Sequence, residues 1–284
     1  MGIYAVTGSA SGMGRAVAEK LRRDGHTVVG VDVKDADIVA DLSDVQGRRA
    51  AADAVRRASK GSLDGAVLAA GLGPGPGRDR PRLIAQVNYF GVVDLLEAWQ
   101  PLLAAADGAK VVVFSSNSTT TTPAVPARAV RAFLAHDAEK AVRAVRLFGG
   151  SASVMAYAAS KIAVSRWVRR EAVGSGWAGA GIRLNALAPG AIMTPLLQEQ
   201  LSDGRRAKLV RSFPVPTGAF GDADQLAEWV LFMLSDAADF LCGSVIFVDG
   251  GTDAYFRADD WPKPVPVHRL LPYWRRFRAG AGRQ

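Results

Sequence analysis

The sequence predicts an α/β fold built on a parallel, doubly wound sheet of about seven strands with helices on both faces. Short apolar runs alternate with stretches of helical spacing along most of the chain, an order typical of parallel strands joined by crossover helices. A glycine-rich turn joins the first apolar run to the first helical stretch. The length of 284 residues and the hydrophobic content of 49% allow one large domain with a sizeable core.

Composition argues against several classes of protein. Cys242 is the single cysteine, so no internal disulfide can form, and the three histidines lack ligand spacing, so we expect no metal. The N-terminus lacks the pattern of a signal peptide, and no apolar run approaches the roughly 18 residues of a membrane span, so we expect a cytoplasmic protein. Residues 257–284 hold seven basic and two acidic residues, which is five of the eight net positive charges. The body is therefore only mildly basic, and we expect no nucleic-acid partner.

The first strand, Ile3–Val6, runs into the glycine-rich turn Thr7–Gly14, and a helix follows to Arg23. Glycines let the backbone approach a pyrophosphate closely, and the N-terminus of the helix offers it unpaired N–H groups. This stretch therefore predicts a dinucleotide site. The second strand, His26–Val31, ends at Asp32, whose carboxylate can accept hydrogen bonds from the adenosine ribose hydroxyls.

The charge of Asp32 would repel a 2′-phosphate, so the sequence favours NAD over NADP, although Lys34 could receive that phosphate. A short third strand over residues 38–40 precedes a helix through Ala58, for which Ser43 and Gln46 predict a capping box. Between them, Asp41 would lie either at the adenine rim or in a solvated loop.

The fourth strand, residues 63–70, is closed by Gly71, and the Gly- and Pro-rich residues 72–81 predict an exposed loop. A long helix follows from about Leu83 to Ala106 and contains Asn88. A polar amide among large apolar neighbours, followed by a glycine, predicts a local distortion of the helix and an inward-facing side chain.

The central strand, Lys110–Phe114, ends in a run of hydroxyl and amide side chains at residues 115–118. Ligands bind at the carboxyl ends of strands in open α/β sheets, so these groups are positioned for chemistry. Adjacent strand residues face opposite sides, so only one of Ser115 and Ser116 can face the cleft. Residues 123–153 then form a helical insertion, whose spacing predicts one or two amphipathic helices.

Tyr157 and Lys161 lie four residues apart in the next helix and therefore share one face. A fixed cation would lower the pKa of the phenol toward neutrality and make Tyr157 a proton donor, although this spacing also occurs by chance on solvent-facing helices. The sixth strand, residues 181–188, precedes a Pro-Gly turn, after which Thr194 and the backbone of Ile192 could hold a carboxamide.

A substrate lid is predicted over residues 195–216. Asp222 then caps a helix to Leu234, and residues 244–248 form the last strand.

These motifs resemble the short-chain dehydrogenase/reductase family over about residues 1–255. They are T-G-x-x-x-G-x-G at Thr7–Gly14, the helical Asn88, the serine after the central strand, and Y-x-x-x-K at Tyr157–Lys161. Within the family the chain is most similar to bacterial hydroxysteroid dehydrogenase/carbonyl reductases, which share V-N-Y-F-G at residues 87–91 and the long insertion. The resemblance implies a single Rossmann-type domain over residues 1–255. It also implies an NAD-dependent oxidoreductase that interconverts a secondary alcohol and a ketone on an apolar, steroid-like or terpenoid substrate.

The resemblance assigns catalytic roles to Asn88, Ser116, Tyr157 and Lys161, and it favours Ser116 over Ser115. Tyr157 would exchange a proton with the substrate oxygen, which Ser116 would polarise. Lys161 would hold the nicotinamide ribose, and Asn88 would anchor a water molecule that relays protons. The residues implied to bind NAD are Gly8, Ser11, Gly12, Met13, Asp32, Asp41, Leu42, Ala70, Gly71, Tyr157, Lys161, Pro189, Gly190, Ile192 and Thr194.

In relatives with such an insertion, the extra helices obstruct the usual four-helix dimer contact, so the resemblance implies a homodimer through the last strand and helix. The basic C-terminal extension, residues 256–284, is rich in proline, aromatic residues and arginine and lies outside the resemblance. It could be an arm over a neighbouring subunit's site, a disordered extension, or a segment on an anionic membrane surface. The alternative functions are a carbonyl reductase of terpenoids or xenobiotics, a catalytically silent NAD-binding sensor, and a nucleic-acid or membrane adaptor.

Overall fold

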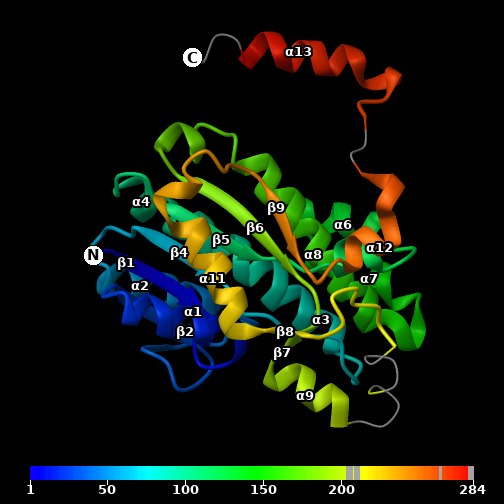
Figure 1. Cartoon of the computed structure of the whole chain (residues 1–284), viewed down its shortest axis with the longest axis horizontal. Coiled ribbons are helices and arrows are strands. Elements are labelled where there is room, and N and C mark those ends of the chain that lie inside the picture. Colours follow the sequence, from blue (N-terminus) through cyan, green and yellow to red (C-terminus); the bar gives the residue numbers. More distant parts are fainter. Residues whose placement is uncertain (203–206, 208–211, 262–263, 281–284) are drawn as a thin grey trace.

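The predicted seven-stranded parallel sheet forms the centre of the computed structural model, which describes residues 1–202, 207, 212–261 and 264–280. Its strand order is β3-β2-β1-β4-β5-β6-β9 (Figure 1). The chain runs outward from β1 to β3 and then crosses back to β4 on the other side of β1. The strands are β1 (Ile3–Thr7), β2 (Thr27–Asp32), β3 (Ile38–Val39), β4 (Gly65–Leu68), β5 (Lys110–Phe114), β6 (Arg183–Pro189) and β9 (Val245–Val248).

Helices cover both faces of the sheet, and each face has its own apolar core. Helices α1 (Gly12–Arg23) and α11 (Ala223–Leu234) pack on one face, where Val112 of β5 points. Helices α2 (Val45–Ala58), α4 (Gly91–Ala104) and α8 (Ala152–Glu171) pack on the other, where Val111 and Val113 point. This alternation along β5 is the two-residue period of a strand that is buried on both faces.

The predicted long helix is divided into three parts: α3 (Arg80–Ala85), a π-helix (Gln86–Phe90) and α4. The expected distortion at Asn88 is therefore confirmed. Asn88 lies in the middle of the π-helix and is fully buried. A π-turn places one more residue in the turn than an α-helix does, which lets this amide point inward.

Two local predictions need correction or addition. The capping box of Ser43 and Gln46 is wrong, because the N-cap of α2 is Asp44, whose carboxylate accepts the Gly47 N–H at 3.0 Å. Ser43 lies in the preceding turn, where its N–H donates to the Asp41 carboxylate at 2.8 Å. A second, two-stranded parallel sheet of β7 (Ile192–Met193) and β8 (Gly221–Asp222) has no counterpart in the predictions.

The insertion contains two amphipathic helices, α6 (Ala127–Leu134) and α7 (Ala138–Arg146), followed by a 3-10 turn (Gly149–Ser151). Their apolar sides, including Phe133 and Val142, are buried, and they pack against α3 and α8. The insertion therefore covers the outer side of the helix that carries Tyr157 and Lys161. A short helix, α5 (Ser118–Thr121), follows β5, and 3-10 turns occupy Ala178–Ala180 and Asp236–Ala238.

The predicted lid begins with helix α9 (Pro195–Ser202) and continues through residues 207 and 212–216, and its other residues lie outside the described part. After β9 come α12 (Thr252–Arg257), 3-10 turns at Ala258–Asp260 and Val267–Arg269, and α13 (Leu270–Gly280). Figure 1 shows α13, in red, lying apart from the sheet. The domain boundary near residue 255 and the role of the C-terminal extension stay predictions. None of the described helices combines the length and the apolar character needed to cross a bilayer.

Candidate active site

The predicted dinucleotide site lies at the carboxyl ends of β1, β2 and β4. A cavity of about 520 Å³ opens there, at the point where the strand order reverses between β1 and β4. Ligands of doubly wound sheets bind at such a switch point. Ten of the predicted cofactor-binding residues line this cavity, namely Gly8, Ser11, Gly12, Met13, Asp32, Asp41, Leu42, Ala70, Gly71 and Thr194.

The glycine-rich turn has the shape that a pyrophosphate needs. Gly8 has a φ of +70°, and a Cβ there would lie 2.8 Å from the Ala70 nitrogen, so a side chain would not fit. Ser11 is the N-cap of α1, makes no side-chain capping bond, and is followed by no acidic residue in the first turn. The N-terminal N–H groups of α1 are therefore available to an anion, and the cavity fits a dinucleotide.

The carboxylate of Asp32, at the end of β2, is held by hydrogen bonds next to this turn. It accepts the Ala10 N–H at 3.0 Å and the Val33 N–H at 2.7 Å. Both bonds hold the carboxylate at the end of β2, where it lines the cavity. Lys34 is exposed and does not line the cavity.

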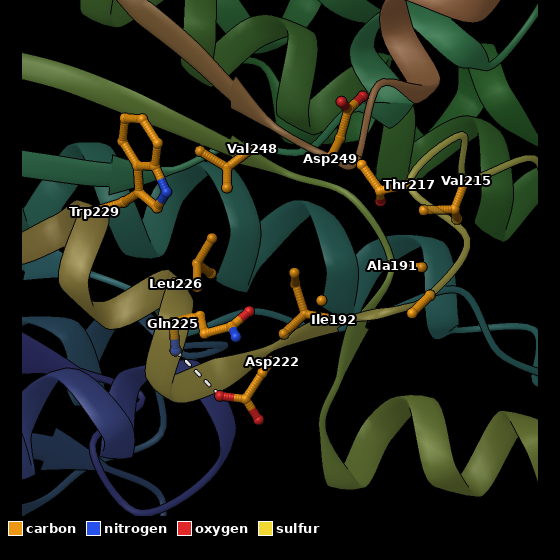
Figure 2. A pocket seen from close by; sticks show the side chains of 13 residues that line it. Ala191, Ile192, Val215, Thr217, Asp222, Gln225, Leu226, Trp229, Val248 and Asp249 are labelled. Atoms are coloured by element: carbon orange, nitrogen blue, oxygen red, sulfur yellow. Dashed lines mark hydrogen bonds between the residues drawn. The ribbon is translucent and has the colours of Figure 1, made fainter.

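Five predicted cofactor-binding residues do not line this cavity, namely Tyr157, Lys161, Pro189, Gly190 and Ile192. Gly190 packs against the main chain of Asp249, and a Cβ on Gly190 would lie 2.7 Å from the Asp249 Cα. Ile192 lines a smaller cavity of about 190 Å³, together with Leu226 and Trp229 of α11 (Figure 2).

Tyr157 meets Ser116 across the carboxyl end of β5. The phenol is hydrogen-bonded to the Ser116 side chain, and the Ser116 oxygen also accepts the Ser118 N–H at 3.1 Å. The hydroxyl of Ser115 instead lies 2.6 Å from that of Ser165 on α8. Of the two adjacent serines, Ser116 is therefore the one that contacts Tyr157.

Lys161 and Asn88 approach each other around Gly71. A Cβ on Gly71 would lie 3.5 Å from the Asn88 Oδ1 and 3.8 Å from the Lys161 Nζ. The Lys161 ammonium donates to the Phe114 carbonyl at 2.6 Å. The Asn88 amide accepts the Leu72 N–H at 2.8 Å and donates to the Leu72 carbonyl at 3.0 Å. Because Gly71 also lines the large cavity, this pair lies at the inner end of the dinucleotide site.

The pKa of the phenol differs from the expectation. Burial raises the pKa of Tyr157 above its ordinary value, and the Ser116 hydrogen bond lowers it by less. Burial also lowers the pKa of Lys161 to about 8. The predicted lowering of the phenol pKa by Lys161 is therefore wrong for this structure. The ammonium is held by the Phe114 carbonyl and is itself desolvated, so loss of water decides the pKa of both groups.

Sequence reasoning missed Arg80 and the apolar wall formed by Leu83 and Val87, all of which line the large cavity. The Arg80 guanidinium donates to the Gly73 carbonyl at 2.9 and 2.7 Å and so fixes the loop before α3. Pro81 could have indicated that a helix begins at this point, because proline is common in the first turn of a helix. Helix α3 does begin at Arg80, which places Arg80 at the end of the preceding loop. The described residues contain no group of three or more His, Cys, Asp or Glu side chains that could hold a metal ion.

Comparisons with known proteins agree with this geometry. A family model described as short chain dehydrogenase matches residues 3–127, and one described as enoyl-(acyl carrier protein) reductase matches residues 140–253. A 3-alpha-hydroxysteroid dehydrogenase/carbonyl reductase of Comamonas testosteroni is 38% identical over 90% of this chain and 98% of that relative. A cis-4-hydroxycyclohexanecarboxylate dehydrogenase of Sinomonas cyclohexanicum is 31% identical over 89% and 96%.

A solved structure is similar over nearly its whole length. It is the 3-alpha-hydroxysteroid dehydrogenase from Pseudomonas sp. B-0831 complexed with NADH, with a TM-score of 0.84 and 42% identity. The match covers 90% of this chain and 99% of that one.

Proposed function

The chain belongs to the short-chain dehydrogenase/reductase family, and we propose that it interconverts a secondary alcohol and a ketone on an apolar, steroid-like substrate with NAD(H). Membership makes it an oxidoreductase of alcohols and ketones that uses a nicotinamide dinucleotide. The observation that supports the proposal most is the contact between Tyr157 and Ser116, beside the buried Lys161 and next to the dinucleotide cavity. The names of the two hydroxysteroid dehydrogenases support the substrate class.

In the proposed mechanism, Tyr157 exchanges a proton with the substrate oxygen, and Ser116 donates a hydrogen bond to the same oxygen. The raised phenol pKa keeps Tyr157 protonated at neutral pH, as a proton donor in ketone reduction requires. The turn from Gly8 to Met13 would hold the pyrophosphate, and Lys161 would hold the nicotinamide ribose. The dinucleotide, when bound, supplies or takes up the hydride.

Asn88 holds Leu72 through two hydrogen bonds, which fixes the backbone between the dinucleotide cavity and the loop that follows it. In the proposal Asn88 also anchors the water molecule that exchanges protons with solvent. Pro189, Gly190, Ile192 and Thr194 would border the nicotinamide end, where Thr194 lines the cavity.

The substrate class can be tested with a panel of steroid and terpenoid alcohols and ketones, each offered with NAD(H) and with NADP(H), while the absorbance of the reduced cofactor is recorded. We expect turnover of secondary alcohols and ketones on apolar skeletons, with NAD(H) preferred. Turnover restricted to small sugars or to acyl carriers would contradict the proposed substrate class. A chain that binds the dinucleotide and turns over none of the panel would instead support a silent sensor.

Asp32 sets the proposed preference for NAD. Its carboxylate would accept bonds from the ribose hydroxyls and repel a 2′-phosphate. In Asp32→Asn we expect the ratio of kcat/KM for NAD to that for NADP to fall about 10- to 100-fold, since hydrogen bonds to a charged group contribute about 1.5–3 kcal/mol. Lys34→Ala is the control and should leave the ratio unchanged, because Lys34 does not line the cavity. A ratio that responds to Lys34 and not to Asp32 would refute this assignment.

The proposed assembly is a homodimer through α11 and β9. Helix α11 exposes Trp229 at 45% and Phe232 at 47%. Strand β9 is the edge of the sheet and is partly exposed along its length. The insertion meanwhile packs on α3 and α8. An apolar helix face beside an unpaired strand edge is a surface suited to a second copy of the chain.

Light scattering after size-exclusion chromatography should therefore report a dimer, and Trp229→Asp should shift it to a monomer because a buried, unpaired charge opposes association. Leu147→Asp is the control, because Leu147 is 72% exposed at the end of α7 and away from this surface. A tetramer, or dissociation by the control variant alone, would contradict the proposed interface.

A further inference from the structure

A third cavity, of about 460 Å³, opens at the start of helix α8. Two stretches that are distant in sequence form it: the loop around Gly75 and Arg78, and the connection from the end of α7 at Arg146 to the first turn of α8 at Ser153. Several lining residues are glycines, so backbone makes up much of the wall. The cavity has the volume of a ligand site, and none of the roles proposed above uses it.

The charged side chains that line this cavity are all positive. Arg78 and Arg146 are the charged residues among those that line the cavity, and both are exposed. Neither guanidinium has an ion pair or a hydrogen bond within the described part of the chain. Their neighbours differ in this respect, because Arg80 is bonded to the Gly73 carbonyl and Arg82 is paired with Glu139. Two guanidinium groups at one cavity without a counter-charge favour an anionic ligand.

Helix α8 links the cavity to the Tyr157 site. Ser153 lies four residues before Tyr157 on the same face of α8, which is a rise of about 6 Å along the helix axis. A helical side chain also covers the turn N-terminal to its own Cα, which brings the phenol toward Ser153. On the other side, Leu72 and Gly75 belong to one loop, and they line the dinucleotide cavity and this cavity respectively.

We propose that Arg78 and Arg146 form an anion-binding subsite for the substrate, one helical turn along α8 from Tyr157. The substrate is then an apolar alcohol or ketone with a carboxylate, sulfonate or sulfate group about 6 Å or more from the reacting carbon. The two guanidinium groups bind this anion and orient the skeleton so that its carbonyl end reaches Tyr157 and Ser116. This inference rests on the proposed function, since it names the substrate class of the same site.

The test uses one skeleton with three end groups: an oxo bile acid with its carboxylate, its neutral methyl ester, and its taurine conjugate, which ends in a sulfonate. In the full-length protein we expect a KM for the acid and for the conjugate about tenfold below that for the ester, with similar kcat, which corresponds to about 1.4 kcal/mol. The difference should shrink at high ionic strength, because exposed charges are screened by salt. A preference for the conjugate alone would show that the subsite binds a sulfonate or sulfate group. Equal KM values for both anions would show that the subsite does not distinguish a carboxylate from a sulfonate.

The double variant Arg78→Gln/Arg146→Gln should remove the preference for the anions and leave kcat and the KM of the ester unchanged. Arg143→Gln is the matched control, because Arg143 is exposed on α7, three residues before Arg146, and does not line the cavity. The inference is overturned if the acid and the ester have equal KM values, or if Arg143→Gln acts like the double variant.

Equilibrium dialysis of the same three compounds measures binding without turnover and separates this inference from the proposed function. Tighter binding of the anions that depends on Arg78 and Arg146, without turnover, would support the subsite and contradict the proposed reaction. Equal binding of the anions and the ester would overturn the subsite, and turnover of the ester would then still support the reaction.

Discussion

Tyr157→Phe is expected to lower kcat about 10²- to 10⁴-fold in both directions, because this is the usual contribution of a positioned acid or base. The change removes only the hydroxyl that meets Ser116, and it leaves the ring and the helix in place. The affinity for the dinucleotide should therefore stay within about twofold of the original, because the substitution removes no bond between the dinucleotide and the Gly8–Met13 turn. A tenfold change in affinity would correspond to about 1.4 kcal/mol. Steady-state kinetics and cofactor titration measure the two quantities.

Tyr255→Phe is the matched control, because Tyr255 is 66% exposed on α12 and lines neither the dinucleotide cavity nor the anion subsite. It should leave kcat unchanged. The raised phenol pKa adds a pH dependence: alcohol oxidation needs the deprotonated phenol, so its rate should rise with pH through the neutral range. An unchanged kcat in Tyr157→Phe, or a wild-type oxidation rate that is independent of pH, would contradict the role of Tyr157.

Lys161→Met should abolish turnover and also stabilise the protein. Lys161 is 4% exposed, and burial lowers its pKa from 10.5 to about 8. Each pH unit between the folded and unfolded pKa corresponds to about 1.4 kcal/mol, so holding the ammonium in the folded state costs about 3 kcal/mol. Methionine has a similar length and no charge, although the bond to the Phe114 carbonyl is lost. We expect the free energy of unfolding to rise by about 1–3 kcal/mol at pH 7.

The sign of the pH effect follows from the lowered pKa. Above about pH 8 the folded protein has released the Lys161 proton, whereas the unfolded chain keeps it up to about pH 10.5. The unfolded state then binds more protons, so the stability contributed at this site rises with pH between these values. Lys161→Met should lose this rise, and the exposed Lys140→Met on α7 should keep it. Urea unfolding at several pH values measures both. A destabilised Lys161→Met with an unchanged pH dependence would show that the folded protein tolerates the charge without cost.

Much of the fold could be predicted because its signals are local. The parallel sheet of about seven strands follows from apolar runs that alternate with helical spacing, and the dinucleotide cavity follows from the glycine turn at residues 7–14. The inward amide of Asn88 follows from a polar residue among large apolar neighbours. The contact of Ser116 with Tyr157 agrees with the two-residue period of a strand, although choosing between the two serines needed the family resemblance.

Other features depend on contacts between distant segments. The two-residue strands β7 and β8 are too short to carry a pattern, and they pair across the 27 residues that separate Met193 from Gly221. Arg78 and Arg146 reach one cavity only because the insertion packs on α3 and α8. The phenol pKa was predicted with the wrong sign because the helix spacing of Tyr157 and Lys161 is visible in the sequence, whereas their shared loss of water is a property of the packed structure.

The π-helix at Gln86–Phe90 makes this segment sensitive to its length. Removing one residue there would allow a regular α-helix, but successive residues in a helix turn by about 100°, so the residues before and after the deletion would change their relative orientation by that amount. Asn88 would leave Leu72, or Val87 would leave the wall of the dinucleotide cavity. At the apolar positions of this segment, replacements of similar volume should be tolerated, whereas single-residue insertions and deletions should be strongly selected against.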